Sequence, residues 1–373
     1  MVKLGDVARG RDNNFNLIRF CAAFAVLISH SFAVATGSGS AEPMRHTLGL
    51  TWAYIAVDVF FLTSGFLVTA SLLARQSAVG FAWARSLRIF PALWVMLVLT
   101  VFGLGLAVTS SSPHDYLAAR GTWRYFIKNA ILLRGMVPDL PGVFSSNPIR
   151  SVVNGSLWTL GPEADMYVIL FALGILATIT RRLGVIRWSV VAIAVAAAAL
   201  YFMNGNFDNS SDEYSRLTFL FFLGASCYLF RDRIPFNRST FSVLLALVLL
   251  SAADRRAFFF AFSVALPYLV LYAAYGFGGR IRAFNRCGDY SYGIYIYAFP
   301  VEQTTAHLAP GISVASLMGI SAIVTLVLAM LSWHLLEKRA LKLKDIAAEK
   351  TRAVLRGISG YGAVAGRDAG GTS

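Results

Sequence analysis

A histidine and an arginine lie in one apolar stretch near the start of the chain, FNLIRFCAAFAVLISHSF, which covers residues 15–32. Arg19 and His30 are 11 residues apart, and three helical turns take about 10.8 residues, so both side chains share one helix face about 16 Å apart. A neutral histidine can act as a general base on a hydroxyl group. Ionisable residues are costly inside a membrane, so a functional role is the default interpretation. The structural alternatives are an arginine that reaches the lipid headgroups and a histidine bonded to a neighbouring helix.

Two carboxylates and an arginine pair occur in or beside other apolar stretches. Asp58 lies in AVDVFFLTSGFLVTASL, and Glu163 lies at the start of a later stretch, in GSLWTLGPEADMYV. Arg85 and Arg88 lie in ARSLRIFPALW, where their i, i+3 spacing places both guanidinium groups on one helix face. Such a pair can bind phosphate oxygens in bidentate fashion. By spacing alone, however, ordinary anchoring at the membrane surface is the favoured interpretation.

These residues together suit two classes of protein. The first is a group-transfer enzyme, in which a histidine deprotonates a hydroxyl group and a carboxylate orients the histidine. The second is a proton-coupled transporter or glycan flippase, in which His30, Asp58 and Glu163 form a proton relay. Internal symmetry and interrupted helix pairs would favour the transporter, and the sequence shows neither clearly.

The composition indicates what kind of chain positions these residues. Of the 373 residues, 57% are hydrophobic and 14% are charged, and the mean hydropathy is +0.63. Soluble globular proteins carry about 25% charged residues, so this chain is predicted to be a polytopic membrane protein. The net charge of +14 does not indicate nucleic-acid binding, because the basic residues lie between apolar runs. Three cysteines, Cys21, Cys227 and Cys287, show no metal-ligand spacing, and neither a metal nor a disulfide framework is expected.

Runs of about 20 apolar residues can cross a bilayer as helices. The predicted fold is an all-α bundle of about ten transmembrane helices, at 16–35, 50–73, 90–109, 157–178, 186–203, 214–230, 239–253, 257–276, 291–308 and 313–335. Basic residues gather at alternate span ends, which predicts that both termini are cytoplasmic. Residues 1–345 are expected to form the membrane domain, and residues 346–373 a disordered cytoplasmic tail.

The predicted outer loop, residues 110–156, carries its own pattern. Basic and apolar residues fall on opposite faces at helical spacing, which predicts an amphipathic helix lying in the interface. The basic residues are Arg120, Arg124, Lys128 and Arg134, and the apolar ones are Trp123, Phe126, Ile127, Ala130 and Ile131. Headgroup anchoring is the favoured interpretation, and a basic rim for an acidic acceptor is the alternative.

Several segments together resemble the integral-membrane acyltransferase-3 family, the bacterial O-acyltransferases of surface glycans. The matching segments, in order, are Arg19 to His30 (Arg-x10-His), DVFFLTSGFLV from Asp58, Arg85-Ser-Leu-Arg88 with IFPALW, SLWTLGPE ending at Glu163, DYSYGIYIYAFPVEQ from Asp289, and SWHLLEKRAL from Ser332. Each motif alone is weak, but the ordered set is specific and covers about 15–340. The family often has Asp where Asn16 stands and His where Ala298 stands, so a second catalytic histidine is not expected.

The resemblance implies a donor, an acceptor and roles for five residues. The donor would be acetyl-CoA or a related acyl-CoA from the cytoplasm, and the acceptor a hydroxyl of a glycan or lipid-linked saccharide. Arg85 and Arg88 would hold the CoA phosphates, and Arg19 would line the same cavity. His30 would be the catalytic residue, as a base or as a carrier of the acyl group, and Glu163 would orient it or bind acceptor hydroxyls. The protein would lie among the lipids of the bacterial inner (cytoplasmic) membrane.

Overall fold

The computed structural model describes residues 2–10, 12–75, 78–132, 135–204 and 213–351. Within these ranges the chain is all α-helical and has no strand, only isolated bridges between Lys3 and Pro235 and between Asp139 and Val152. The all-α prediction is therefore confirmed. Residues 344–351 are helical, where the sequence predicts that a disordered tail begins at 346. The rest of that predicted tail, and Arg134 of the outer loop, lie outside the described residues.

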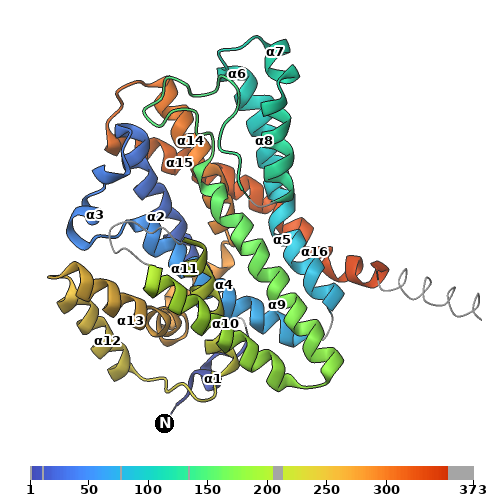
Figure 1. Cartoon of the computed structure of the whole chain (residues 1–373), viewed down its shortest axis with the longest axis vertical. Helices are drawn as coiled ribbons and strands as arrows, with labels where there is room; N and C mark the ends of the chain where they lie inside the picture. Colours follow the sequence, from blue (N-terminus) through green and yellow to red (C-terminus); the bar gives the residue numbers. More distant parts are fainter. Residues whose placement is uncertain (1, 11, 76–77, 133–134, 205–212, 352–373) are drawn as a thin grey trace, which may run out of the picture.

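Each of the ten predicted spans coincides with a helix, and Figure 1 shows these helices packed as a bundle. Their bounds are α2 (Phe15–Thr36), α4 (Trp52–Arg75), α5 (Ala78–Val98), α9 (Leu160–Thr180), α10 (Leu183–Asn204), α11 (Glu213–Leu229), α12 (Arg238–Ser251), α13 (Arg255–Gly276), α14 (Ser291–Leu308) and α15 (Val314–Ser332). Among the described residues, 7 helices are long and apolar enough to cross a membrane, a set that does not include α11, α12 or α14. The first two are shorter, and α14 carries polar residues such as Glu302 and Gln303.

The third span differs from its prediction, because its helix begins well before residue 90. α5 starts at Ala78 and continues through a π-helical turn, Leu99–Gly105, into α6 (Leu106–Val108). Phe81, Ala84 and Ile89 are buried at helical spacing along the early part of α5, which explains the extension. Arg85 and Arg88, expected just before the span, therefore lie inside the helix.

The shorter helices lie mostly in the connections. They are α1 (Leu4–Val7), α3 (Pro43–Leu48), α7 (Pro113–Ala118), α8 (Arg120–Ile131) and α16 (Lys338–Lys342). α8 confirms the helix predicted in the outer loop. On its apolar side, Trp123 and Phe126 both pack against Phe102, with ring centroids 6.0 Å apart in each pair. Trp123 and Ile127 nevertheless stay largely exposed.

The segment between α8 and α9 is more buried than an ordinary surface loop. Phe144 and Val153 are fully buried, and the Asn147 amide donates to the backbone oxygen of Gln303 in α14 at 2.8 Å. The Gln303 amide in turn donates to the backbone oxygen of Val152 at 2.6 Å. This segment therefore enters the bundle before α9 begins, although it is a loop as predicted.

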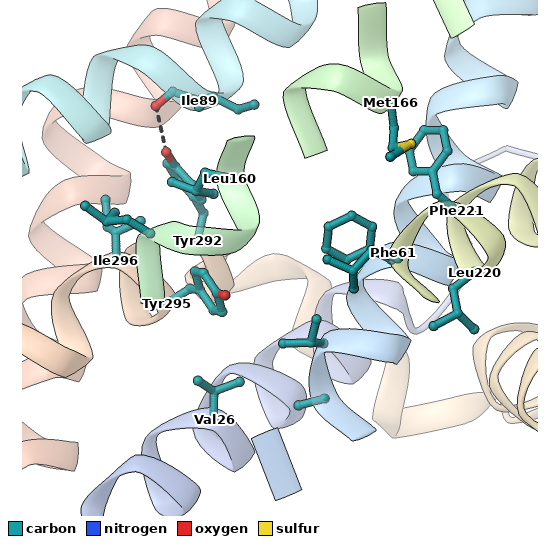
Figure 2. Packing of buried hydrophobic residues seen from close by; sticks show 14 of the residues in the cluster. Val26, Phe61, Ile89, Leu160, Met166, Leu220, Phe221, Tyr292, Tyr295 and Ile296 are labelled. Atoms are coloured by element: carbon teal, nitrogen blue, oxygen red, sulfur yellow. Dashed lines mark hydrogen bonds between the residues drawn. The ribbon is translucent and has the colours of Figure 1, made fainter. Parts of the chain in front are cut away.

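α4 and α11 pack closely against each other in the core. A Cβ atom on Gly65 would lie 1.8 Å from the backbone oxygen of Phe221, and one on Gly224 would lie 2.0 Å from that of Leu62. Small residues at such positions let membrane helices approach closely. Figure 2 shows Phe61, Leu220 and Phe221 gathered beside this contact, and Tyr292, Tyr295 and Leu160 grouped farther along the core.

Candidate active site

Glu163 lies in the first turn of α9 and is held by hydroxyl groups. Ser64 of α4 donates to its Oε1 atom at 3.0 Å, and the Tyr167 hydroxyl, one turn along α9, donates a short hydrogen bond to the same atom. The Ser64 and Tyr167 hydroxyl groups also lie 3.0 Å from each other. These contacts fix the position of the carboxylate at the junction of α4 and α9.

Glu163 and Arg19 line one small cavity of about 30 Å³. Its wall also includes Phe60 of α4 and Tyr292 and Tyr295 of α14. The Tyr292 hydroxyl donates to the backbone oxygen of Ile89 at 2.9 Å, so its ring is held in place (Figure 2). A cavity of this size holds about one water molecule. The structure thus brings two predicted site residues, from α2 and α9, to one shared cavity.

Arg88 has its donor groups occupied by two carboxylates. Its Nη2 atom lies 2.6 Å from Oδ2 of Asp289, and its Nη1 atom lies 3.2 Å from Oε2 of Glu337. Asp289 lies between α13 and α14, and Glu337 lies in a π-helical turn, Trp333–Glu337, after α15. Burial raises the pKa of Asp289, but the Arg88 guanidinium and then Arg19 outweigh it, so the pKa lies below its ordinary value. Asp289 is therefore ionised in this cluster.

Arg85 and Arg19 differ from Arg88, because each has a buried Nε atom without a hydrogen-bond partner among the described residues. The guanidinium carbon of Arg85 lies 5.8 Å from the ring centroid of Tyr167, which places Arg85 beside the Glu163 group. That of Arg19 lies 5.8 Å from the ring centroid of Phe60. Each of these two arginines thus has one donor atom, Nε, open to a ligand.

His30 lies farther along α2, away from this group. Its ring packs edge-on against Phe299 of α14, with centroids 5.1 Å apart, and its Nδ1 atom is buried without a partner among the described residues. Within the described part of the chain, no hydrogen bond joins His30 to Glu163. The structure therefore does not show Glu163 orienting the histidine directly.

Asp58 belongs to another set of contacts, since it forms an ion pair with Arg216 of α11 at 2.6 Å. Three predicted relay residues, His30, Asp58 and Glu163, thus have separate partners in the described structure. The chain of hydrogen bonds that a proton relay would need is absent among the described residues, and the transporter alternative gains no support.

Residues 12–334 match the model of a protein family, acyltransferase 3, which is described as an acyltransferase domain. This chain belongs to the acyltransferase-3 family. Among its relatives, an O-acetyl transferase of Shigella phage Sf6 is 29% identical over 354 residues, covering 89% of this chain and 96% of the relative. Nodulation protein 10 of Rhizobium leguminosarum bv. viciae is 32% identical over 370 residues, covering 90% and 95%. No solved structure matches this acyltransferase.

The apolar helices and the family together make this acyltransferase a multi-pass membrane protein. Among the described residues, no group of three or more His, Cys, Asp or Glu side chains could hold a metal ion.

Sequence reasoning missed the acidic partners inside the acyltransferase. Asp289 and Glu337 stand within segments that the sequence singled out, but nothing in those segments indicates that both reach Arg88. Glu302 is fully buried in α14. Like His30, it is an ionisable residue within an apolar stretch, and this pattern could have identified it as a candidate site residue. Glu42 is also buried, in the connection between α2 and α4, and its sequence context gave no such signal.

Proposed function

We propose that this enzyme transfers an acyl group, acetyl in the simplest case, from cytoplasmic acyl-CoA to a hydroxyl of a surface or lipid-linked glycan. The family supports acyl transfer, and the name of the phage Sf6 relative supports an O-acetyl group. The observation that carries the proposal is the buried, unpartnered Nδ1 atom of His30, on the same helix as the cationic side chain of Arg19. A general base must have a free ring nitrogen, and this one has no partner among the described residues.

In the proposed reaction, His30 accepts the proton of the acceptor hydroxyl while the hydroxyl oxygen attacks the carbonyl carbon of the thioester. The new C–O bond forms as the C–S bond breaks, and the proton passes from His30 to the departing CoA thiolate. The products are the O-acyl glycan and free CoA. Glu163, which is fixed by Ser64 and Tyr167 and faces the small cavity, is proposed to bind a hydroxyl group of the acceptor.

The donor site is proposed at the three arginines. Arg85 and Arg19 offer unpartnered nitrogen atoms to the phosphate oxygens of CoA, and guanidinium groups bind such oxygens strongly. Arg88 would add positive potential and, through Asp289 and Glu337, hold the ends of α14 and α15 against α5. Arg88 is given the structural role because two carboxylates already occupy its guanidinium group, whereas Arg85 and Arg19 each keep an Nε atom without a partner among the described residues.

The proposed topology has ten spans, with α11, α12 and α14 crossing alongside the longer helices and both termini in the cytoplasm. Residues 1–345 would form the membrane domain, in the bacterial inner membrane. The basic residues at alternate helix ends support this orientation. It places Arg85 and Arg88 in the half of the membrane that cytoplasmic acyl-CoA can reach.

Binding of acetyl-CoA to the purified protein in detergent tests the donor. We expect saturable binding by the wild type, a loss of affinity of at least about tenfold in Arg85→Ala, and a further loss in the double variant with Arg88→Ala. Arg187 is an exposed arginine on α10, so Arg187→Ala is the matched control and should bind acetyl-CoA normally.

His30→Ala should bind acetyl-CoA normally but lose transfer to the native glycan by about a hundredfold or more. A folded wild type without binding would overturn the acyl-CoA proposal, and normal transfer by His30→Ala would overturn the role of His30.

A further inference from the structure

Two buried glutamates are bonded to the serines on either side of His30. The Ser29 hydroxyl donates a short hydrogen bond to Oε2 of Glu42, and the Ser31 hydroxyl donates to Oε1 of Glu302 at 2.6 Å. Glu42 is 1% exposed and Glu302 is 0% exposed. Carboxylates are rarely buried to this degree unless they are paired, so each calls for a physical explanation.

The two carboxylates differ in their second oxygen atom. Oε1 of Glu42 accepts the backbone N–H of Trp52 at 2.5 Å, so both of its oxygen atoms have donors. Oε2 of Glu302 is buried and has no donor among the described residues. Glu302 also forms no ion pair with any described side chain. Glu42 is therefore a complete structural anchor between α2 and α4, whereas Glu302 keeps one carboxyl oxygen without a partner. Because Glu302 has no cationic partner among the described residues, this buried carboxyl group is neutral, and the open oxygen carries its proton.

The open position of Glu302 lies in the same part of the α2–α14 contact as His30. Phe299, which packs against the His30 ring, precedes Glu302 by three residues, and residues at this spacing share one helix face. Ser31, which holds Glu302, follows His30 directly. Two buried polar atoms, Nδ1 of His30 and Oε2 of Glu302, thus lack partners at one contact. Leaving both unpaired costs about 1–3 kcal/mol each, which a ligand that forms a hydrogen bond with each atom would remove.

We propose that Glu302 binds the acceptor saccharide, donating a hydrogen bond to a second hydroxyl group beside the one that His30 deprotonates. The inference rests on the proposed acyl transfer. With Nε2 protonated, His30 Nδ1 is an acceptor, and the Oε2 atom of the neutral Glu302 is a donor. Two neighbouring hydroxyl groups complement them, because one donates its proton and the oxygen of the other accepts. A sugar ring carries such neighbouring hydroxyl groups, whereas a simple alcohol carries one. Glu302 would thereby make the enzyme selective for saccharide acceptors.

Glu302→Met is the decisive variant, because methionine has a similar length but no hydrogen-bond donor, and the Ser31 hydroxyl keeps its bond to the backbone oxygen of Leu27 at 3.0 Å. The assay measures transfer of labelled acetyl from acetyl-CoA to the deacetylated polysaccharide fraction of native cells. The amount of this acceptor is varied, and its concentration is expressed as sugar content. We expect the acceptor concentration for half-maximal rate to rise about tenfold or more. The affinity for acetyl-CoA and the thermal stability should stay at the wild-type level.

Glu42→Gln is the matched control. A glutamine there has one acceptor oxygen for two donors, so this variant should lose thermal stability and keep the wild-type dependence on acceptor concentration. Glu302→Gln is the rescue variant: its amide oxygen still accepts the Ser31 hydroxyl and its NH2 group replaces the O–H donor, so it should keep the wild-type acceptor dependence. If Glu302→Met does not accumulate, Glu302→Ala replaces it and should also raise the acceptor requirement. An unchanged acceptor dependence in the folded Glu302→Met or Glu302→Ala variant, or a loss of acetyl-CoA affinity, would overturn the role of Glu302. A wild type that neither binds acetyl-CoA nor transfers acetyl would instead overturn the proposed function itself.

Discussion

Arg216 of α11 and Asp58 of α4 form an ion pair inside the bundle, with 2.6 Å between Nη1 and Oδ1. Their side chains are 3% and 5% exposed, and Arg216 also pairs with Glu213 and lies over the ring of Tyr54 at 3.6 Å. Asp58 therefore has a permanent cationic partner that its own sequence segment does not reveal. The pair joins the same two helices that the glycine contacts bring together, so it is a structural element of the core.

Asp58→Asn should lower the free energy of unfolding by about 3–5 kcal/mol, because it leaves the Arg216 charge without a full partner inside the protein. Thermal unfolding in detergent measures the effect. Asp6→Asn is the control, since the Asp6–Arg9 pair is exposed and spans 3.8 Å, and such pairs contribute little to stability. If Asp58→Asn lost acyl transfer but kept its stability, Asp58 would have a functional role and the purely structural role would be wrong.

Gly65→Ala and Gly224→Ala should each destabilise the protein by about 1–3 kcal/mol or more, because the added methyl group meets backbone atoms that cannot rotate away. Gly319→Ala in α15 is the control: its Cβ would meet nothing within 4 Å, and alanine is the better helix former. Thermal unfolding of the three variants side by side is the measurement. Equal stability of all three would mean that α4 and α11 are farther apart than described.

Arg88→Ala and Arg85→Ala should affect different properties. Removing Arg88 leaves Asp289 and Glu337 without their cation, so stability should fall by about 3–5 kcal/mol. Adding Asp289→Asn and Glu337→Gln to Arg88→Ala should restore much of that loss, because the uncompensated charges are then gone. Arg85→Ala breaks no ion pair of the described residues, so it should unfold at the wild-type temperature. A comparison of melting temperatures decides this, and an equal loss in Arg85→Ala would contradict the division of roles.

Gln303→Leu should release the buried segment between α8 and α9. The amide of Gln303 donates to the backbone oxygen atoms of Ile149 and Val152 at 2.9 and 2.6 Å, and leucine leaves both without this donor. Each lost buried partner costs about 1–3 kcal/mol. Trypsin cleavage after the exposed Arg150 should become faster, which gel electrophoresis of a time course measures. Thr305→Val is the control, because its hydroxyl donates to Val301 within the same helix; equal cleavage rates in both variants would refute the contact.

The helices were predictable from the sequence because a long apolar run has few alternatives to a helix in lipid. Each predicted span coincides with a helix, although the start of α5 is wrong by about a dozen residues, since residues 78–89 mix arginine with apolar side chains. The burial of the segment before α9 was not predictable. It depends on hydrogen bonds between Asn147 and Gln303, which are far apart in the chain.

The sequence by itself determined the class of protein, the ordered motifs of the acyltransferase-3 family and the shared helix face of Arg19 and His30, because composition, order and helical periodicity are properties of the chain. Only the tertiary structure decided which charged groups meet. It placed Asp289 and Glu337 on Arg88, Arg216 on Asp58, and Glu302 on Ser31, the residue after His30. These partners come from helices distant in the chain, and neither hydropathy nor spacing records which faces of two helices pack together.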